Sequence, residues 1–172
     1  MLFRSIEGWD NIDIYYDSPS VIKGDISKLP AYNDNSVDII YASHVLEHFH
    51  KDTYFSVLKL WHDKLKPGGI LRLAVPDFEQ VCIQYLEKRN ITEVSGLTLG
   101  GQKNPYDFHG MIFDQPLLYD TLSTIGFVDI HRYDWRVTDH HNVDDFSQAY
   151  LPHMLKEGGR LMSLNMEAKK RS

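Results

Sequence analysis

SVDIIYASHVLEHFHKDTYFSVLKLWHDKLKPGGILRLAVPD, at residues 36–77, contains the signals of a strand, a helix, a turn and a second strand. The run VDIIYAS at 37–43 is rich in β-branched and aromatic residues, which is typical of a strand buried on both faces. A helix follows, because apolar side chains recur at helical spacing, at Tyr54, Leu58, Trp61 and Leu65. KPGG turns the chain, and ILRLAVP at 70–76 is the second strand.

Two strands joined by a helix are expected to be parallel, with a right-handed crossover. Ligands of such open sheets bind beyond the carboxyl ends of the strands. This places residues 43–48 and 76–79 on one rim, which is the predicted functional edge of the protein.

The rest of the chain continues the alternation of strands and helices, which predicts an α/β fold in one domain spanning 1–172. We expect strands at 11–15, 21–23, 127–135 and 161–168, and helices at 78–86 and 115–125. The last strand is predicted to be antiparallel at the edge of the sheet. Residues 91–107 are the least regular part, and the glycine-rich stretch at 96–110 is predicted to be a loop over the rim.

The composition excludes several classes of protein. The chain has 172 residues, a net charge of -6 and a single cysteine, Cys82, which argue against general nucleic-acid binding and exclude an internal disulfide. Neither a membrane-spanning run nor a signal peptide is visible. We therefore expect a cytoplasmic protein with no membrane partner.

Four segments resemble, in order and spacing, the class I S-adenosylmethionine-dependent methyltransferases. They are GDISKLP at 24–30, NSVDIIYASHVLEHF at 35–49, LKPGGILRLAVPDFE at 65–79 and HGMIFDQPLLYDTLSTIGFVDI at 109–130. The resemblance implies a three-layer Rossmann-like sandwich with a mostly parallel sheet and an antiparallel C-terminal edge strand. It also implies S-adenosylmethionine as the cofactor and methyl transfer to a small-molecule or surface-accessible acceptor.

The same resemblance assigns residues to the cofactor. Asp13 matches the acid that accepts hydrogen bonds from the ribose hydroxyls, and Asp25 with Ile26 matches the pair that contacts adenine. The strand end that faces the methionine and methyl groups is matched by Ser43, His44 and Leu46. The alternative for both aspartates is an ordinary turn or cap role.

Two histidines are catalytic candidates. His44 is expected to contact substrate or cofactor directly, and His109, in the predicted loop over the rim, is a candidate base. A base is needed only when a neutral acceptor must lose a proton. We expect residues 91–107 and 135–152 to form the acceptor site, and we expect no metal.

The chain departs from the family pattern before Asp13, where no G-x-G is present. We expect a fold that is N-terminally truncated, with methyl transfer impaired by the missing glycine-rich loop. The slot of the family's first strand, next to residues 37–43, is then open, or residues 1–6 fill part of it, or a second chain does so in a homodimer. A degenerate, non-catalytic binding domain is the first alternative.

A second alternative is a zinc hydrolase, because His44-Val-Leu-Glu47-His48 reads as H-x-x-E-H. In that interpretation the two histidines bind zinc and Glu47 activates water. The motif directly follows a buried strand instead of lying inside a long helix. A third ligand is not evident, although Glu79 or His109 could serve.

Overall fold

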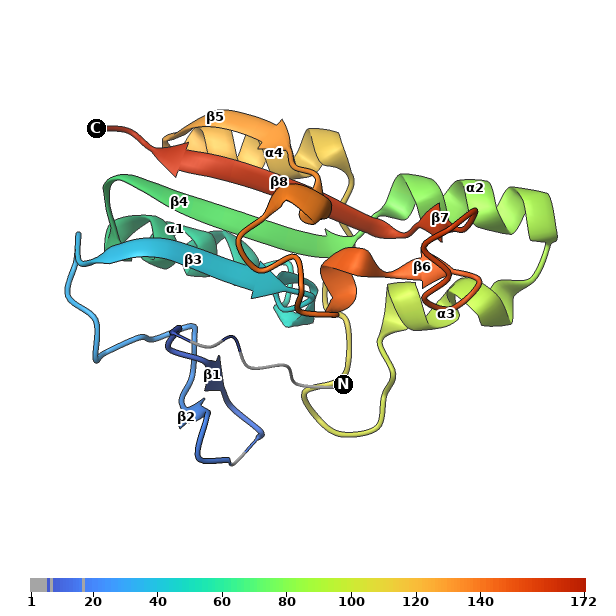
Figure 1. The fold of residues 1–172 in the computed structure, drawn as a ribbon, viewed down its shortest axis with the longest axis horizontal. Helices are drawn as coiled ribbons and strands as arrows, with labels where there is room; N and C mark the ends of the chain where they lie inside the picture. The colour runs from blue at the N-terminus through green and yellow to red at the C-terminus, as the bar shows by residue number, and fades with distance from the viewer. Residues whose placement is uncertain (1–5, 7, 17) are drawn as a thin grey trace.

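A four-stranded sheet forms the centre of the protein in a computed structural model that describes residues 6, 8–16 and 18–172 (Figure 1). Its order is β3-β4-β8-β5. The strands are β3 (Val37–Ser43), β4 (Leu65–Pro76), β5 (Phe127–Arg132) and β8 (Ser163–Lys170). β3 and β4 are parallel, as the sequence predicted, and β8 is antiparallel to both β4 and β5. Three of the four strands therefore run in one direction.

The predicted edge position of the last strand is wrong. β8 is antiparallel as expected, but it lies between β4 and β5, and seven of its residues are in register with β4. Ser163 and Asn165 gave the segment the polar alternation of an edge strand. Both are buried, because the Ser163 hydroxyl donates to Asn165 and the Asn165 amide donates to the carbonyl of Ser147.

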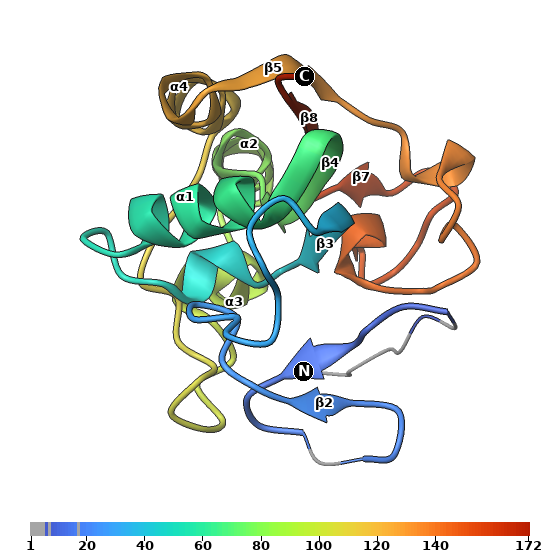
Figure 2. The same cartoon turned by 90° about the vertical axis from the view of Figure 1, so that its left-hand side faces the viewer.

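Helices cover one face of this sheet, and irregular chain covers the other (Figure 2). The helical face carries α1 (Tyr54–Lys64) and α4 (Gln115–Ile125), which contact each other. Residues 133–162 lie across the opposite face and contain η2 (Trp135–Val137), η3 (Phe146–Gln148), β6 (Tyr150–Leu151) and β7 (Arg160–Leu161). The result is a three-layer α/β architecture whose third layer is built of turns and 3-10 helices.

Two further helices follow the carboxyl end of β4. α2 (Phe78–Lys88) was predicted, whereas α3 (Ile91–Leu99) falls in the segment that was expected to be irregular. The Asn90 side chain accepts a hydrogen bond from the backbone N–H of Thr92, and Val94 is buried, so a cap and one apolar contact stabilise this helix. Gly100, with φ of 80°, ends it, and the predicted loop begins only there.

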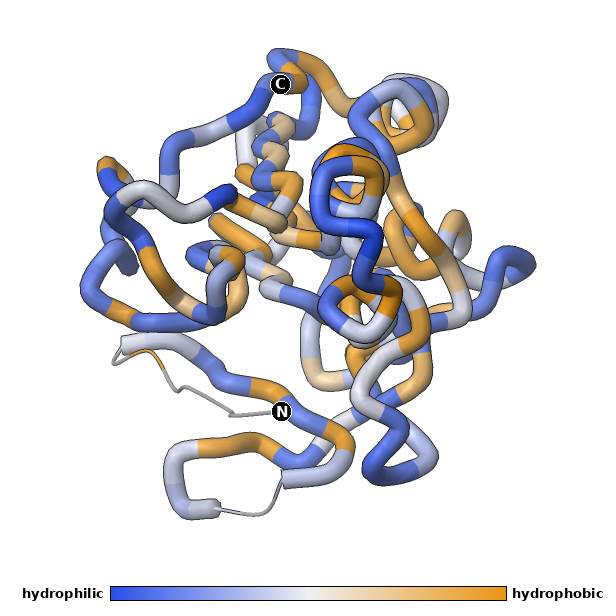
Figure 3. Tube along the Cα trace, turned by 90° about the vertical axis from the view of Figure 1, so that its right-hand side faces the viewer, coloured by the Kyte–Doolittle hydropathy of each residue, from blue (hydrophilic) through white to orange (hydrophobic). Residues whose placement is uncertain are grey.

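The hydrophobic core lies between the sheet and the helices that cover it. In Figure 3 the helices carry hydrophobic residues, shown in orange, along one side and hydrophilic residues, shown in blue, along the other. Trp61 is 1% exposed and donates from its indole to the carbonyl of Ile26 at 2.9 Å. This contact ties α1 to the N-terminal part of the chain. Among the described residues, no helix combines the length and hydrophobicity that crossing a bilayer requires.

The N-terminal strands form a separate two-stranded sheet. β1 (Ile12–Asp13) and β2 (Ile22–Lys23) pair in parallel and are shorter than predicted. Neither belongs to the main sheet, so β3 is its outer strand in the part of the chain that is described. The open slot beside residues 37–43 is thus confirmed for these residues. The suggestion that residues 1–6 fill it concerns positions that, apart from Ile6, lie outside the description.

Candidate functional site

The predicted rim is formed where β3 ends. His44 has φ of 52°, so the chain turns sharply there and enters the three-residue 3-10 helix η1 (Leu46–His48). The neighbouring strand, β4, ends at Pro76, and Asp77 caps α2 by accepting from the N–H of Glu79. The carboxyl ends of two parallel strands therefore lie side by side, as expected.

A cavity of about 370 Å³, here called the N-terminal cavity, opens beside η1. Asp13, Asp25 and Ile26 line it from the N-terminal part of the chain, and Tyr106 and His109 line it from the loop after α3. Three of the predicted cofactor residues, which are up to 13 positions apart in the sequence, are thus brought to one cavity. Its volume is in the ordinary range for a small-molecule site.

Both aspartates also act in local turns, as the alternative interpretation expected. Oδ1 of Asp13 accepts from the backbone N–H groups of Tyr15 and Tyr16 at 2.7 and 2.8 Å. Asp25 accepts from Ser27 and pairs with Lys28 at 2.9 Å, and these contacts lower the pKa of its carboxyl group. The bonds fix both carboxylates in place at the cavity wall. A turn role and a ligand role are therefore compatible.

A second cavity of about 310 Å³, the histidine cavity, lies on the other side of η1. His44, Glu47, His48 and His109 line one wall. The remaining walls come from residues 93–107 and 146–162, which overlap the segments predicted to form an acceptor site. His48, Asp107 and His109 line both cavities, so the two cavities share a wall.

Burial dominates the electrostatics of the histidine wall. It raises the pKa of Glu47 to about 8, because the charged carboxylate would lose its hydration there. Burial, reinforced by His109 and His48, lowers the pKa of His44 to about 3. Burial and the neighbouring His48 lower the pKa of His109 to about 4. At neutral pH these imidazoles are uncharged and retain a lone pair.

His44 is held by contacts on several sides. Its Nδ1 lies 3.3 Å from Oε1 of Glu47, and its Nε2 lies 3.3 Å from the hydroxyl of Ser163. The ring packs against Phe146 with the two centroids 5.2 Å apart. His44 is 6% exposed and faces the histidine cavity, so it does not share the N-terminal cavity with Asp13 and Asp25.

The other predicted residues differ in their placement. The Ser43 hydroxyl is buried without a hydrogen-bond partner among the described residues. Leu46 is fully buried in the core, so its side chain does not reach either cavity. The potential metal ligands that the described residues bring together are Glu47, His48 and His109, of which only His48 is a ligand in the H-x-x-E-H motif.

One partly buried group of charged and aromatic side chains was missed. Arg72 donates to Glu167 at 2.8 Å and to Asp139 at 2.7 Å, and His140 is buried and stacks on Tyr41 with the centroids 4.0 Å apart. The sequence does contain a signal that Arg72 is paired, because a single charged residue inside the apolar run ILRLAVP requires a partner of opposite charge. Nothing comparable distinguishes His140 from a solvent-exposed histidine.

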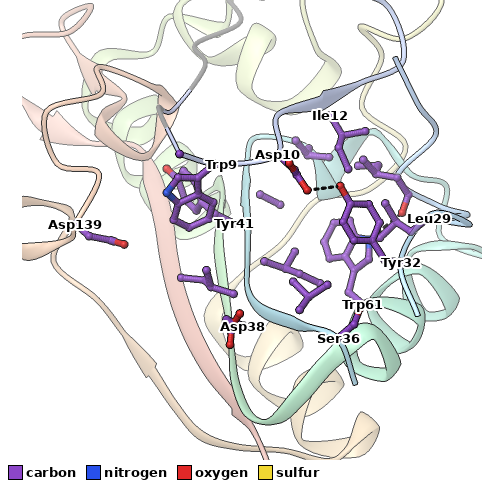
Figure 4. A pocket seen from close by; sticks show the side chains of 17 residues that line it. Trp9, Asp10, Ile12, Leu29, Tyr32, Ser36, Asp38, Tyr41, Trp61 and Asp139 are labelled. Carbon is purple, nitrogen blue, oxygen red and sulfur yellow. Dashed lines mark hydrogen bonds between the residues drawn. The ribbon is translucent and has the colours of Figure 1, made fainter. Parts of the chain in front are cut away.

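A third cavity, of about 610 Å³, lies along the open side of β3 and is called the edge cavity (Figure 4). Trp9 and Tyr41 line one side of it, and Tyr32 and Trp61 line the other. The Tyr32 hydroxyl donates to Asp10 at 2.9 Å and closes one end. The edge cavity is lined both by β3 of the main sheet and by Ile12 of the small N-terminal sheet, so it lies between the two sheets.

Comparison with known proteins agrees with this architecture. Residues 10–73 match the family described as Methyltransferase domain. Among solved structures, the chain resembles the Burkholderia thailandensis 1,6-didemethyltoxoflavin-N1-methyltransferase, which was solved with 1,6-didemethyltoxoflavin and S-adenosylhomocysteine bound. That likeness has a TM-score of 0.54 and 18% identity over 94% of this chain and 60% of the other. No curated protein matches the chain.

Two other solved structures give the same picture. An Archaeoglobus fulgidus SAM-dependent methyltransferase has a TM-score of 0.53 and 17% identity over 88% of this chain and 67% of the other. A Thermotoga maritima SAM-dependent methyltransferase has a TM-score of 0.55 and 18% identity over 88% and 64%. The chain thus spans 60–67% of the lengths of these three proteins. The chain therefore has the fold of these S-adenosylmethionine-dependent methyltransferases, and its residues 10–73 match the methyltransferase-domain family.

Proposed function

We propose that the chain binds S-adenosylmethionine in the N-terminal cavity and transfers its methyl group to a small or surface-accessible acceptor. The observation that carries this proposal is the meeting of Asp13, Asp25 and Ile26 at one cavity beside the rim. Further support comes from the methyltransferase match of residues 10–73 and from the relative that holds S-adenosylhomocysteine.

The residues present suit the chemistry of a nucleoside. Oδ2 of Asp13 takes part in neither turn bond and remains to accept from ribose hydroxyls. Asp25 is placed to accept from the adenine amine. The carbonyl of Ile26 is occupied by the Trp61 indole, so the contact proposed for Ile26 falls to its N–H. Ser43 and His44 remain proposed contacts to the methionine part of the cofactor. The side chain of Leu46 is buried in the core, so only its backbone could contact the cofactor.

The sulfonium of the cofactor supplies an activated methyl group, so the protein has to position the acceptor and exclude water. We place the acceptor in the histidine cavity, which shares a wall with the N-terminal cavity. A neutral acceptor would lose its proton to an imidazole. His109 keeps Nε2 free for that role, because its Nδ1 lies 3.2 Å from the carbonyl of Leu97 and is the protonated nitrogen.

Calorimetric titration with S-adenosylmethionine and S-adenosylhomocysteine tests the proposal. Asp13→Asn and Asp25→Asn each remove a charged acceptor and should weaken binding by about 10- to 100-fold. Asp120→Asn, on the exposed side of α4, is the matched control and should bind like the wild type. Binding that is absent in the wild type, or equal in all four proteins, would refute the proposed site.

A non-catalytic binding domain is the second candidate, and the open side of β3 favours it. The outer strand of a sheet presents unpaired backbone groups, and the edge cavity leaves room beside them. In that case a second chain completes the sheet, as in the homodimer considered from the sequence. Light scattering after size exclusion should then give a dimer that does not bind S-adenosylmethionine. A monomer that binds it excludes this candidate.

A further inference from the structure

Glu47, His48 and His109 form a cluster whose ligand atoms all lie within 4.8 Å of one another. We propose that this cluster binds a divalent transition-metal ion, with Zn²⁺ as the best fit. Two of the residues belong to η1, and the third belongs to the loop that follows α3. Two imidazoles and one carboxylate are a donor set that proteins use for zinc, and they leave a fourth coordination position open.

The first argument is a buried carboxyl group without a partner. Glu47 is 1% exposed, and neither of its oxygens has a hydrogen-bond partner among the residues that the structure describes. Nδ1 of His44 and Nε2 of His109 lie 3.3 and 4.0 Å from Oε1, but neither contact has hydrogen-bond geometry. Native proteins rarely leave such a group unsatisfied. A cation beside Glu47 would supply the missing interaction.

The second argument is the orientation of the imidazoles. Nδ1 of His48 lies 3.1 Å from the carbonyl of Phe108, and Nδ1 of His109 lies 3.2 Å from the carbonyl of Leu97. A carbonyl oxygen only accepts, so each Nδ1 carries the hydrogen and each Nε2 keeps its lone pair. Metal-binding histidines are fixed in this way, with the second nitrogen donating to a carbonyl or carboxylate. Both rings are thus prepared as ligands before any ion arrives.

The size of the cluster is close to what zinc needs. With bonds of 2.0–2.2 Å, tetrahedral ligand atoms lie about 3.4 Å apart, so the largest separation in the cluster has to shorten by up to about 1.4 Å. The two rings are already close, with centroids 4.8 Å apart and planes nearly perpendicular. All three residues line the histidine cavity, and His48 and His109 also line the N-terminal cavity, so the site lies in the wall that the two cavities share.

This site differs from the H-x-x-E-H interpretation. That motif uses His44 and His48 as ligands and Glu47 as a base, whereas the observed cluster uses Glu47 as a ligand and His109 in place of His44. Metal binding also excludes the base role proposed for His109, because Nε2 cannot hold an ion and a proton together. The two roles of His109 therefore predict different effects of a chelator. A chelator removes an ion that His109 holds, whereas it has no effect on a His109 that acts as a base.

Titration of chelator-treated, metal-free protein with Co²⁺ and then Zn²⁺ tests the proposal without any cofactor. We expect one Co²⁺ per chain, visible d–d absorption, and displacement of Co²⁺ by Zn²⁺. Glu47→Gln and His109→Ala should each weaken Zn²⁺ binding by about 100-fold or more, since even outer-shell changes cost about 10- to 100-fold. His131→Ala removes an exposed histidine on β5 and is the control that should bind normally.

A measurement on the wild type alone covers the case in which a variant fails to fold. Nitrogen NMR of the imidazoles should show Nε2 of His48 and of His109 shifting when Zn²⁺ is added, while His131 stays unchanged. The absence of saturable binding overturns the proposal, and so does binding that persists in both ligand variants. Calorimetry with S-adenosylmethionine is independent of these results, so failure of the metal site is distinguishable from failure of the proposed function.

Discussion

Replacing Gly110 by alanine should detach the loop after α3 from η1. A Cβ built at this position would lie 2.8 Å from the carbonyl oxygen of Phe49 and 3.0 Å from Cα of His50. Ordinary contacts between such atoms begin near about 3.5 Å, so the two backbones must separate by roughly 0.7 Å. The backbone hydrogen bonds nearest this contact run from the N–H groups of Gly110 and Met111, which both donate to the carbonyl of Glu47, at 2.8 and 3.2 Å.

The expected cost follows from these two bonds. Each contributes about 0.5–1.5 kcal/mol, so Gly110→Ala should lower the free energy of unfolding by about 1–3 kcal/mol. For a chain of this size the melting temperature should fall by about 2–4 °C per kcal/mol. Circular dichroism during urea and thermal unfolding measures both quantities.

Gly96 provides a matched control with the opposite sign. It lies inside α3, and a Cβ there would meet no atom within 4 Å. Gly96→Ala should therefore raise the free energy of unfolding by about 0.5–1 kcal/mol through helix propensity. Equal effects of the two substitutions, or a Gly110→Ala protein as stable as the wild type, would refute the packing described for this loop.

Three other outcomes are expected. Burial and Arg72 lower the pKa of His140, so its contribution to stability is complete above about pH 6.5 and is lost as the pH falls, by at most about 1.4 kcal/mol per unit. His140→Phe should reduce that loss in urea unfolding series, and an unchanged acid slope would contradict the assignment. Arg72→Met should lower the free energy of unfolding by about 1–3 kcal/mol, because the Glu167 carboxylate loses its partner at 2.8 Å while keeping some exposure. A change near zero in the same urea unfolding series would show that the pair behaves as a surface ion pair. Trp61→Phe deletes the indole hydrogen bond to the carbonyl of Ile26 and should lower the free energy of unfolding by about 1–3 kcal/mol. The N-terminal sheet should lose its hydrogen-exchange protection first. Uniform loss of protection would argue against the proposed link between α1 and the N-terminal part of the chain.

The central strand–helix–strand unit could be predicted because its signals are local. β3 has its predicted bounds, α1 begins at the first residue of the expected apolar stripe, and β4 ends at Pro76 as predicted. β4 begins at Leu65, however, so the KPGG segment that was expected to turn the chain lies inside the strand. Outside this unit, α4 has its predicted bounds. The interior position of β8 could not be predicted, because it depends on the hydrogen bonds that bury Ser163 and Asn165. Such bonds have no signature in a short alternating segment.

The candidate site was predictable to a similar extent. The sequence identified Asp13, Asp25 and His109, and the structure brings all three to one cavity. It did not predict that Glu47 is buried beside His109, because the two residues are 62 positions apart and meet only when the loop after α3 packs on η1. Patterns along a chain reveal which chemistry is available, whereas long-range packing decides which groups meet.

The open side of β3 has a consequence for how amide protons exchange with solvent. The N–H of His44 donates to the carbonyl of Ala74 in β4, and amides alternate in direction along a strand. The amides of Ile39 and Tyr41 therefore point away from β4, toward the edge cavity. β3 should therefore show an alternating pattern, in which slow deuterium uptake at one position is followed by fast uptake at the next. Any extended segment that came to lie along this side would erase the alternation.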